Sequence, residues 1–267
     1  MAHCARVTGH CRRCEGALPF DFTMAFQPIV DVEHRRIHAY EALVRGPGGE
    51  PAGQVLDRVT DVELYRFDQA CRVRAIEQAS RLGMRESLSI NFLPNAVYEP
   101  EACLAATLEV SHRVGWPPEK LIFEIVESER ISDRDHLMAI ITAYRRRGFR
   151  VALDDFGTGH ANLDMLADLH PDKLKLDRRL IEDCHRDPRR QALIEATVTL
   201  ARRLGLTLIA EGVETAAEAC WLLEAGIGLQ QGYYFARPAL DALATVPAER
   251  FEALHAAPLS RRDAACR

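Results

Sequence analysis

The sequence predicts an α/β protein of the closed (β/α)₈ class, a TIM-type barrel with an antiparallel first strand. Helical stretches alternate with short apolar strands, a glycine often separates the two, and eight strand candidates occur within 267 residues. Glycine after a helix lets the chain reverse without a Cβ penalty. Helices that alternate with strands indicate parallel strands joined by crossover helices. An open doubly wound sheet is the competing fold.

The expected strands share short apolar runs, and they are Met24–Val30, Ile37–Arg45, Ser87–Asn91, Leu121–Val126, Phe149–Asp154, Lys173–Leu176, Leu206–Ala210 and Gly228–Tyr233. The expected helices lie between them, at 54–81, 100–114, 132–147, 161–169, 188–204 and 215–225. Residues 31–36, between the first two strands, are too few for a crossover helix. Those two strands should therefore form an antiparallel hairpin.

The periodic pattern covers only the middle of the chain. We expect an N-terminal extension at 1–20, a barrel domain at 21–250 and a C-terminal tail at 251–267. The extension holds Cys4, Cys11 and Cys14, which could form a zinc or redox site with nearby histidines or be part of an ordinary extension. The ten histidines follow no ligand spacing such as His-Glu-x-x-His.

Composition limits the class of function. The formal charge of −5 does not favour binding to a DNA or RNA duplex, which requires a basic face. No apolar stretch approaches the roughly 20 residues that span a bilayer, and the N-terminus has no apolar signal region. We therefore expect a cytoplasmic protein without membrane contact, its scattered cysteines mostly reduced.

Polar side chains end or interrupt the predicted strands. In a barrel enzyme the chemistry lies at the C-terminal ends of the strands. A single aspartate there is usually a helix N-cap, but a whole set of buried carboxylates must be paired or bind metal. The set comprises Glu41, Asn91, Glu124, Asp154, Asp155, Lys175, Glu211 and Gln231.

Oxygen ligands without a Cys or His cluster suit Mg²⁺ or Mn²⁺. Five carboxylates are too many for one Mg²⁺, so two Mg²⁺ or Mn²⁺ ions about 3.5–4 Å apart are expected, with Asp154 and Asp155 able to serve both. The ions would activate a water, and Lys175 would orient it or offset negative charge. Arg45 is either a phosphate clamp or a surface arginine.

At this point the sequence resembles the EAL family of cyclic di-GMP phosphodiesterases. The likeness runs from about residue 22 to 245, which makes coincidence improbable, whereas Glu-Ala-Leu alone would mean little. The matching motifs are Glu41-Ala42-Leu43-Val44-Arg45, Phe26-Gln27-Pro28-Ile29-Val30-Asp31, Ile90-Asn91-Phe92, Phe123-Glu124-Ile125-Val126-Glu127-Ser128, Asp154-Asp155-Phe156-Gly157-Thr158-Gly159, Lys173-Leu174-Lys175-Leu176-Asp177, Ala210-Glu211-Gly212-Val213-Glu214 and Gln231-Gly232-Tyr233.

The resemblance implies a barrel enzyme that opens cyclic di-GMP to linear pGpG with two Mg²⁺ or Mn²⁺ ions. By position, the implied metal ligands are Glu41, Asn91, Glu124, Asp154 and Asp155, and the catalytic residues are Glu41, Lys175 and Glu211. The implied substrate contacts are Gln27, Leu43, Arg45, Asp177 and Gln231, with Asp177 equally readable as a helix N-cap. Glu127 would anchor the loop 155–162. The resemblance also implies a homodimer, and control by an upstream sensory partner or by dimer contacts.

Three positions depart from the family pattern: His160-Ala161-Asn162, Val126 and Phe92-Leu93-Pro94. None removes a catalytic group, but the first two could alter loop 155–162. Two rival functions therefore stay open. One is a non-catalytic cyclic di-GMP receptor, which the intact ligand set does not favour. The other is an unrelated metal-dependent barrel enzyme that uses Lys175 as a base.

Overall fold

The computed structural model describes residues 6–7, 10–11, 16–94, 97, 100–125, 134–157 and 163–255. Two short strands near the N-terminus, β1 (Arg6–Val7) and β2 (His10–Cys11), form a ladder of their own. The strands of the main sheet are β3 (Thr23–Asp31), β4 (Arg36–Arg45), β5 (Ser87–Phe92), β6 (Leu121–Ile125), β7 (Arg150–Phe156), β8 (Lys173–Leu176), β9 (Thr207–Ala210), β10 (Leu229–Gln230) and β11 (Ala239–Leu240).

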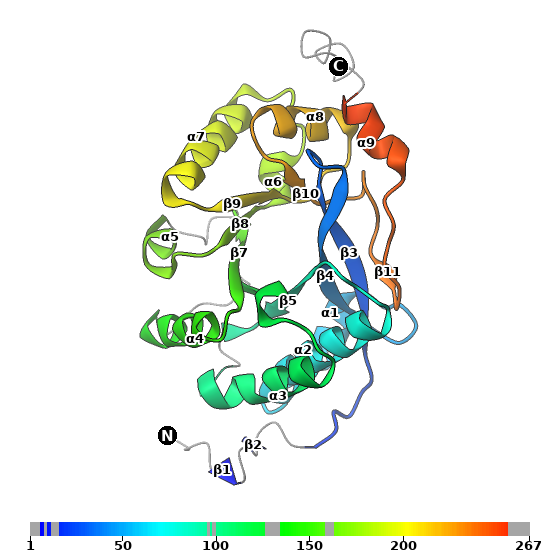
Figure 1. Cartoon of the computed structure of the whole chain (residues 1–267), viewed down its shortest axis with the longest axis vertical. Coiled ribbons are helices and arrows are strands. Elements are labelled where there is room, and N and C mark those ends of the chain that lie inside the picture. Colours follow the sequence, from blue (N-terminus) through cyan, green and yellow to red (C-terminus); the bar gives the residue numbers. More distant parts are fainter. Residues whose placement is uncertain are drawn as a thin grey trace. The chain divides into compact units, whose positions relative to one another are not determined.

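Helices lie between successive strands from β4 to β10, and α9 follows β11 (Figure 1). They are α1 (Ala52–Leu56), α2 (Leu64–Arg81), α3 (Pro100–Arg113), α4 (Arg134–Arg146), α5 (Leu163–Leu169), α6 (Arg178–Ile181), α7 (Pro188–Leu204), α8 (Ala216–Glu224) and α9 (Ala248–His255). The helix–glycine–strand pattern is confirmed at Gly205, which ends α7 in the left-handed conformation with φ 69°.

The strand order of the main sheet is β10-β9-β8-β7-β6-β5-β4-β3-β11, and β10 also pairs with β3. The order from β3 to β10 therefore closes on itself, as the predicted (β/α)₈ barrel requires. β10 runs parallel to β9 but antiparallel to β3. This confirms the antiparallel first strand, which the short 31–36 connection predicts.

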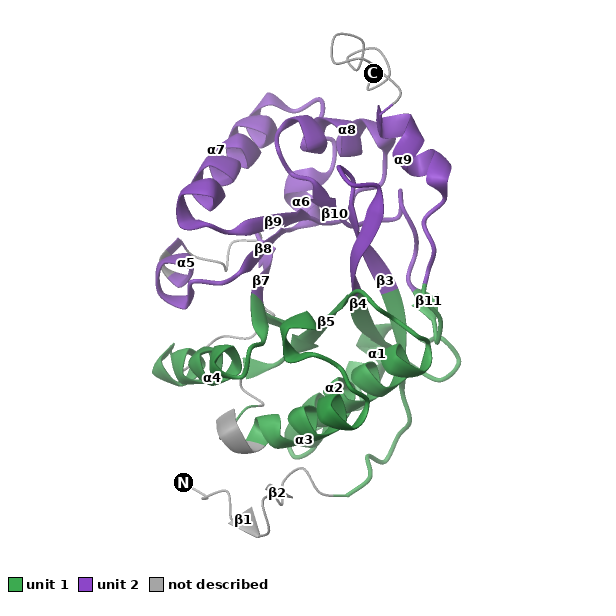
Figure 2. Cartoon of the chain, viewed as in Figure 1, with its two compact units in different colours: residues 1–26, 41–151, 239–243 green, residues 27–40, 152–238, 244–267 purple. Residues whose placement is uncertain are grey.

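The chain divides into two compact units (Figure 2). Unit 1 comprises 1–26, 41–151 and 239–243, and unit 2 comprises 27–40, 152–238 and 244–267. Because β3, β4 and β7 each contribute residues to both, the units are not consecutive domains of the sequence.

The core of unit 1 contains a buried ion pair inside an aromatic cluster. Arg72 on α2 donates to Asp68 Oδ2 at 2.5 Å and to the Tyr144 hydroxyl at 2.6 Å. Its guanidinium carbon lies 5.5 Å from the ring centroids of both Phe92 and Phe123. Burial raises the pKa of Asp68, although Arg72 opposes the shift. Burial alone would lower the pKa of Arg72, but facing Asp68 raises it overall.

Unit 2 is organised by well-capped helices. Thr215 and Glu218 form a capping box at the start of α8, in which each side chain accepts a hydrogen bond from the backbone N–H of the other residue. Asp187 caps α7 by accepting from the backbone N–H of Arg189 at 2.9 Å. These caps fix the segments that follow β8 and β9, where two predicted site residues lie.

Two expectations about individual elements were wrong. The single helix expected at 54–81 is two helices, because Glu63 Oε2 accepts hydrogen bonds from the backbone and hydroxyl of Thr60 and so starts a new helix. The expected strand Gly228–Tyr233 is only β10, with two residues. The pairing of β11 with β3, formed by Ala239–Leu240, has no periodic signal in the sequence.

Within the described ranges, no helix combines the length and apolar character needed to cross a bilayer.

The buried pair gives a stability prediction. Arg72→Met leaves the Asp68 carboxylate buried without its cation, so the free energy of unfolding should fall by about 3–5 kcal/mol in urea denaturation. The matched control is Arg113→Met, which breaks an ion pair with Glu77 whose side chains are 57% and 43% exposed. The control should cost less than about 1 kcal/mol. Equal losses in the two variants would contradict the role of burial.

Candidate metal and active site

Unit 1 contributes three neighbouring strands with one oxygen-bearing residue each. Glu41 lies on β4, Asn91 on β5 and Glu124 on β6, and Asn91 is in register with Glu124. Asn91 Nδ2 donates to Glu41 Oε1 at 2.9 Å, which leaves its amide oxygen as a further acceptor. Glu41 is 6% exposed and Glu124 is fully buried. Two buried carboxylates therefore lie in this group, and the amide of Asn91 holds that of Glu41.

Ser89 is a member of this group that the sequence analysis did not identify. Its hydroxyl donates to Glu124 Oε1 at 2.6 Å, and both residues are buried. The strand pattern of the sequence could have indicated Ser89, because it lies two residues before Asn91 and alternate residues of a strand share a face. The bond fixes the orientation of the Glu124 carboxylate.

Unit 2 brings Asp154, Asp155 and Glu211 together. One carboxylate oxygen of each lies within 4.8 Å of the others. Consecutive residues of a regular strand point to opposite faces, so neighbouring aspartates share a site only where the strand is interrupted. The pairing of β7 with β8 shifts register between Leu153 and Phe156, and Asp155 has φ 56°. This irregular strand end aims both carboxylates at one place.

Lys175 supplies a cation to the same cluster. It lies on β8, is 1% exposed, and its Nζ is 3.2 Å from Asp154 Oδ2 and 2.6 Å from Glu211 Oε1. Glu211 follows β9 directly, and its backbone N–H donates to the Leu176 carbonyl at 3.0 Å. One lysine does not balance three carboxylates, so the cluster has an excess of negative charge. Its all-oxygen donor set fits a hard divalent cation.

The predicted substrate contacts are placed as follows. Gln27 is buried and donates to the Ala236 carbonyl at 3.2 Å. Leu43 lines a cavity of about 280 Å³ in unit 1 that Asn91 also lines. Arg45 Nη1 donates to the carbonyl of its neighbour Val44 at 2.7 Å.

Two further predicted contacts belong to unit 2. The Asp177 carboxylate accepts from the backbone N–H of Arg179 at 2.8 Å and caps α6, as the alternative interpretation expected. Gln231 is buried, and its backbone N–H donates to the Ala210 carbonyl at 2.8 Å. Glu127, Val126 and His160-Ala161-Asn162 lie outside the described residues, as do Cys4 and Cys14.

Comparison with known proteins gives a family model and several relatives. The EAL domain model matches residues 19–238. The blue light- and temperature-regulated antirepressor BluF of Escherichia coli is 35% identical over 83% of this chain and 55% of its own length. The probable cyclic di-GMP phosphodiesterase PdeG of Escherichia coli is 33% identical over 80% of this chain and 44% of its own. This chain therefore spans about half the length of these relatives.

Solved structures agree with these matches. A standalone versatile EAL protein from Vibrio cholerae O395, in its c-di-GMP bound form, is 46% identical with a TM-score of 0.85, covering 88% of this chain and 99% of that one. Klebsiella pneumoniae BlrP1, in a manganese and cyclic di-GMP complex at pH 6, is 34% identical with a TM-score of 0.80, covering 86% of this chain and 59% of that one.

Proposed function

The chain belongs to the EAL domain family, and from this premise we propose that it hydrolyses cyclic di-GMP to linear pGpG with two Mg²⁺ or Mn²⁺ ions. The observation that carries the proposal is the convergence of Asp154, Asp155 and Glu211 around Lys175 in unit 2. The relative named as a probable cyclic di-GMP phosphodiesterase and the structures with bound c-di-GMP support the choice of substrate.

In this proposal the metal ligands are Glu41, Asn91, Glu124, Asp154 and Asp155. Two divalent ions supply an activated water at neutral pH and neutralise charge on the phosphodiester. BlrP1 with manganese and cyclic di-GMP, together with the oxygen donor set here, supports this assignment.

Lys175 and Glu211 carry the proton chemistry in the proposal. With Nζ 2.6 Å from Glu211 Oε1, Lys175 orients that carboxylate toward the attacking water, and Glu211 accepts its proton. The positive charge of Lys175 offsets negative charge that develops on the phosphate. Gln27, Leu43, Arg45, Asp177 and Gln231 contact the dinucleotide, and Glu127 anchors loop 155–162.

We further propose that the protein works as a homodimer controlled by an upstream sensory partner or by contacts between subunits. A non-catalytic receptor is the second candidate, because the relative BluF is named as an antirepressor. The complete set of metal and proton-transfer residues favours the enzyme. The two functions differ in whether bound cyclic di-GMP is consumed.

Chromatography of the reaction products separates the enzyme from the receptor. Purified protein with Mg²⁺ or Mn²⁺ should convert cyclic di-GMP to pGpG, measured by product chromatography, and EDTA should stop the reaction. Glu41→Ala should abolish turnover while the circular dichroism spectrum stays unchanged, because Glu41 binds metal and is not a core hydrophobic residue. Binding without cleavage by the wild-type chain would identify a receptor instead.

Substitution of Lys175 tests its proposed role in turnover. Lys175→Met keeps most of the side-chain volume but removes the charge that orients Glu211 and offsets negative charge on the phosphate, so turnover should fall by at least about 10²-fold. Cyclic di-GMP binding, measured by calorimetry with Ca²⁺, should persist. The control Lys173→Met makes the same change two residues earlier on β8 and should retain turnover. Equal rates in the two variants would refute the role of Lys175.

Substitution of Ser89 tests whether its hydroxyl supports metal binding by Glu124. Ser89→Ala removes the hydrogen bond that orients Glu124, and loss of such a supporting contact typically costs about 10–100-fold in metal affinity. Titration of turnover and of Mn²⁺ binding, the latter by electron paramagnetic resonance, should both shift to higher metal concentration. Ser87→Ala, on the same strand, is the control and should shift neither. An unchanged Mn²⁺ affinity in Ser89→Ala would show that the hydroxyl has no supporting role.

A further inference from the structure

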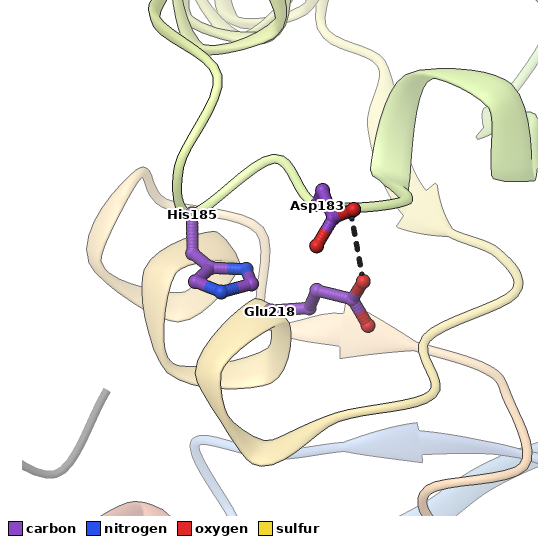
Figure 3. Close-up of side chains that lie close together, drawn as sticks. All are labelled: Asp183, His185 and Glu218. Carbon is purple, nitrogen blue, oxygen red and sulfur yellow. Dashed lines mark hydrogen bonds between the residues drawn. The ribbon is translucent and has the colours of Figure 1, made fainter. Parts of the chain in front are cut away.

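A second group of metal-ligating side chains lies in unit 2, formed by Asp183, His185 and Glu218. Asp183 and His185 belong to the loop after α6, and Glu218 belongs to the first turn of α8. Figure 3 shows the three side chains gathered between this loop and that turn. One ligand atom of each lies within 4.8 Å of the others. None of the three is among the proposed catalytic residues.

The histidine in this group is the first sign of a ligand. Both ring nitrogens of the half-buried His185 are shielded from solvent, and neither has a hydrogen-bond partner in the part of the chain that the structure describes. A neutral imidazole has one donor and one acceptor, and leaving them unsatisfied costs free energy. An ion bound to the ring nitrogen would remove part of that cost.

The Glu218 carboxylate is held rigidly with one position left open. Its Oε2 accepts from the backbone N–H groups of Glu214 and Thr215 at 3.0 and 2.9 Å. Its Oε1 accepts from the backbone N–H of Asp183 at 2.9 Å, shown as the dashed line in Figure 3. Because a carboxylate oxygen can accept about two hydrogen bonds, Oε1 keeps one lone pair for a cation. The site is therefore partly preorganised by the capping box.

Asp183 completes the group from the solvent side. Its backbone has φ 54°, in the left-handed region, and its side chain is exposed. Ligand atoms of a tetrahedral ion with bonds of about 2.0–2.2 Å lie roughly 3.5 Å apart, so a small contraction of the group is needed. Rotation of the exposed Asp183 side chain can supply it.

We propose that Asp183, His185 and Glu218 bind one Zn²⁺ ion, with water as the fourth ligand. One imidazole and two carboxylates suit zinc better than Mg²⁺, which prefers oxygen ligands and retains its water. The two carboxylates balance the charge of the ion. The ion ties the loop after α6 to the start of α8, and the site does not depend on the proposed phosphodiesterase activity.

The test measures bound zinc per chain by equilibrium dialysis against Zn²⁺, followed by elemental analysis, on the whole chain of 267 residues. Because the cysteines and the catalytic carboxylates can also hold zinc, the comparison is between variants that keep all of them. His185→Gln should bind one equivalent less than the wild type. The control His112→Gln removes an exposed imidazole from α3 and should bind the wild-type amount.

A second variant guards against misfolding. Asp183→Asn keeps the shape of the exposed side chain, suits the left-handed backbone at φ 54°, and leaves the Asp183 N–H that donates to Glu218 in place. It loses the charge, so it should also bind one equivalent less zinc while its melting temperature without metal stays near that of the wild type. The proposal is overturned if either His185→Gln or Asp183→Asn binds as much zinc as the wild type. Turnover of cyclic di-GMP, measured in parallel with Mg²⁺, should be unchanged in His185→Gln.

Discussion

Repulsion among three carboxylates, one buried and two half-buried, governs how the site of this protein is built. Asp154, Asp155 and Glu211 present carboxylate oxygens within 4.8 Å of one another, and Lys175 brings a single positive charge to them. A buried carboxylate without a partner is costly, so such a cluster is stable only with further cations or in a site that binds them. The binding of cations therefore offsets part of the free-energy cost of bringing these carboxylates together.

The fold meets this constraint through topology and one local irregularity. Parallel strands of a barrel deliver their C-terminal ends to the same side, which brings residues from β7, β8 and β9 together. The regular alternation of a strand would separate Asp154 from Asp155. The register shift and the positive φ of Asp155 overcome that separation, so backbone strain at the site is part of how it is built.

The sequence allowed the barrel and its strand-end residues to be predicted, because the helix–glycine–strand pattern is local and repeats. Features that depend on packing were not visible in it. The break between α1 and α2 depends on the bonds between Glu63 and Thr60, and the support of Glu124 depends on Ser89 on a neighbouring strand. The group of Asp183, His185 and Glu218 escaped the search for histidine motifs because Glu218 is far from the others in sequence.

The proposed function requires that Glu41, Asn91, Glu124, Asp154 and Asp155 bind two divalent ions. Anomalous diffraction from crystals grown with Mn²⁺ tests it most directly, because the scattering identifies the metal and its ligands together. Two peaks are expected, with Glu41, Asn91, Glu124, Asp154 and Asp155 among the ligands. A map without manganese at these residues, from protein that is fully active with Mn²⁺, would contradict it.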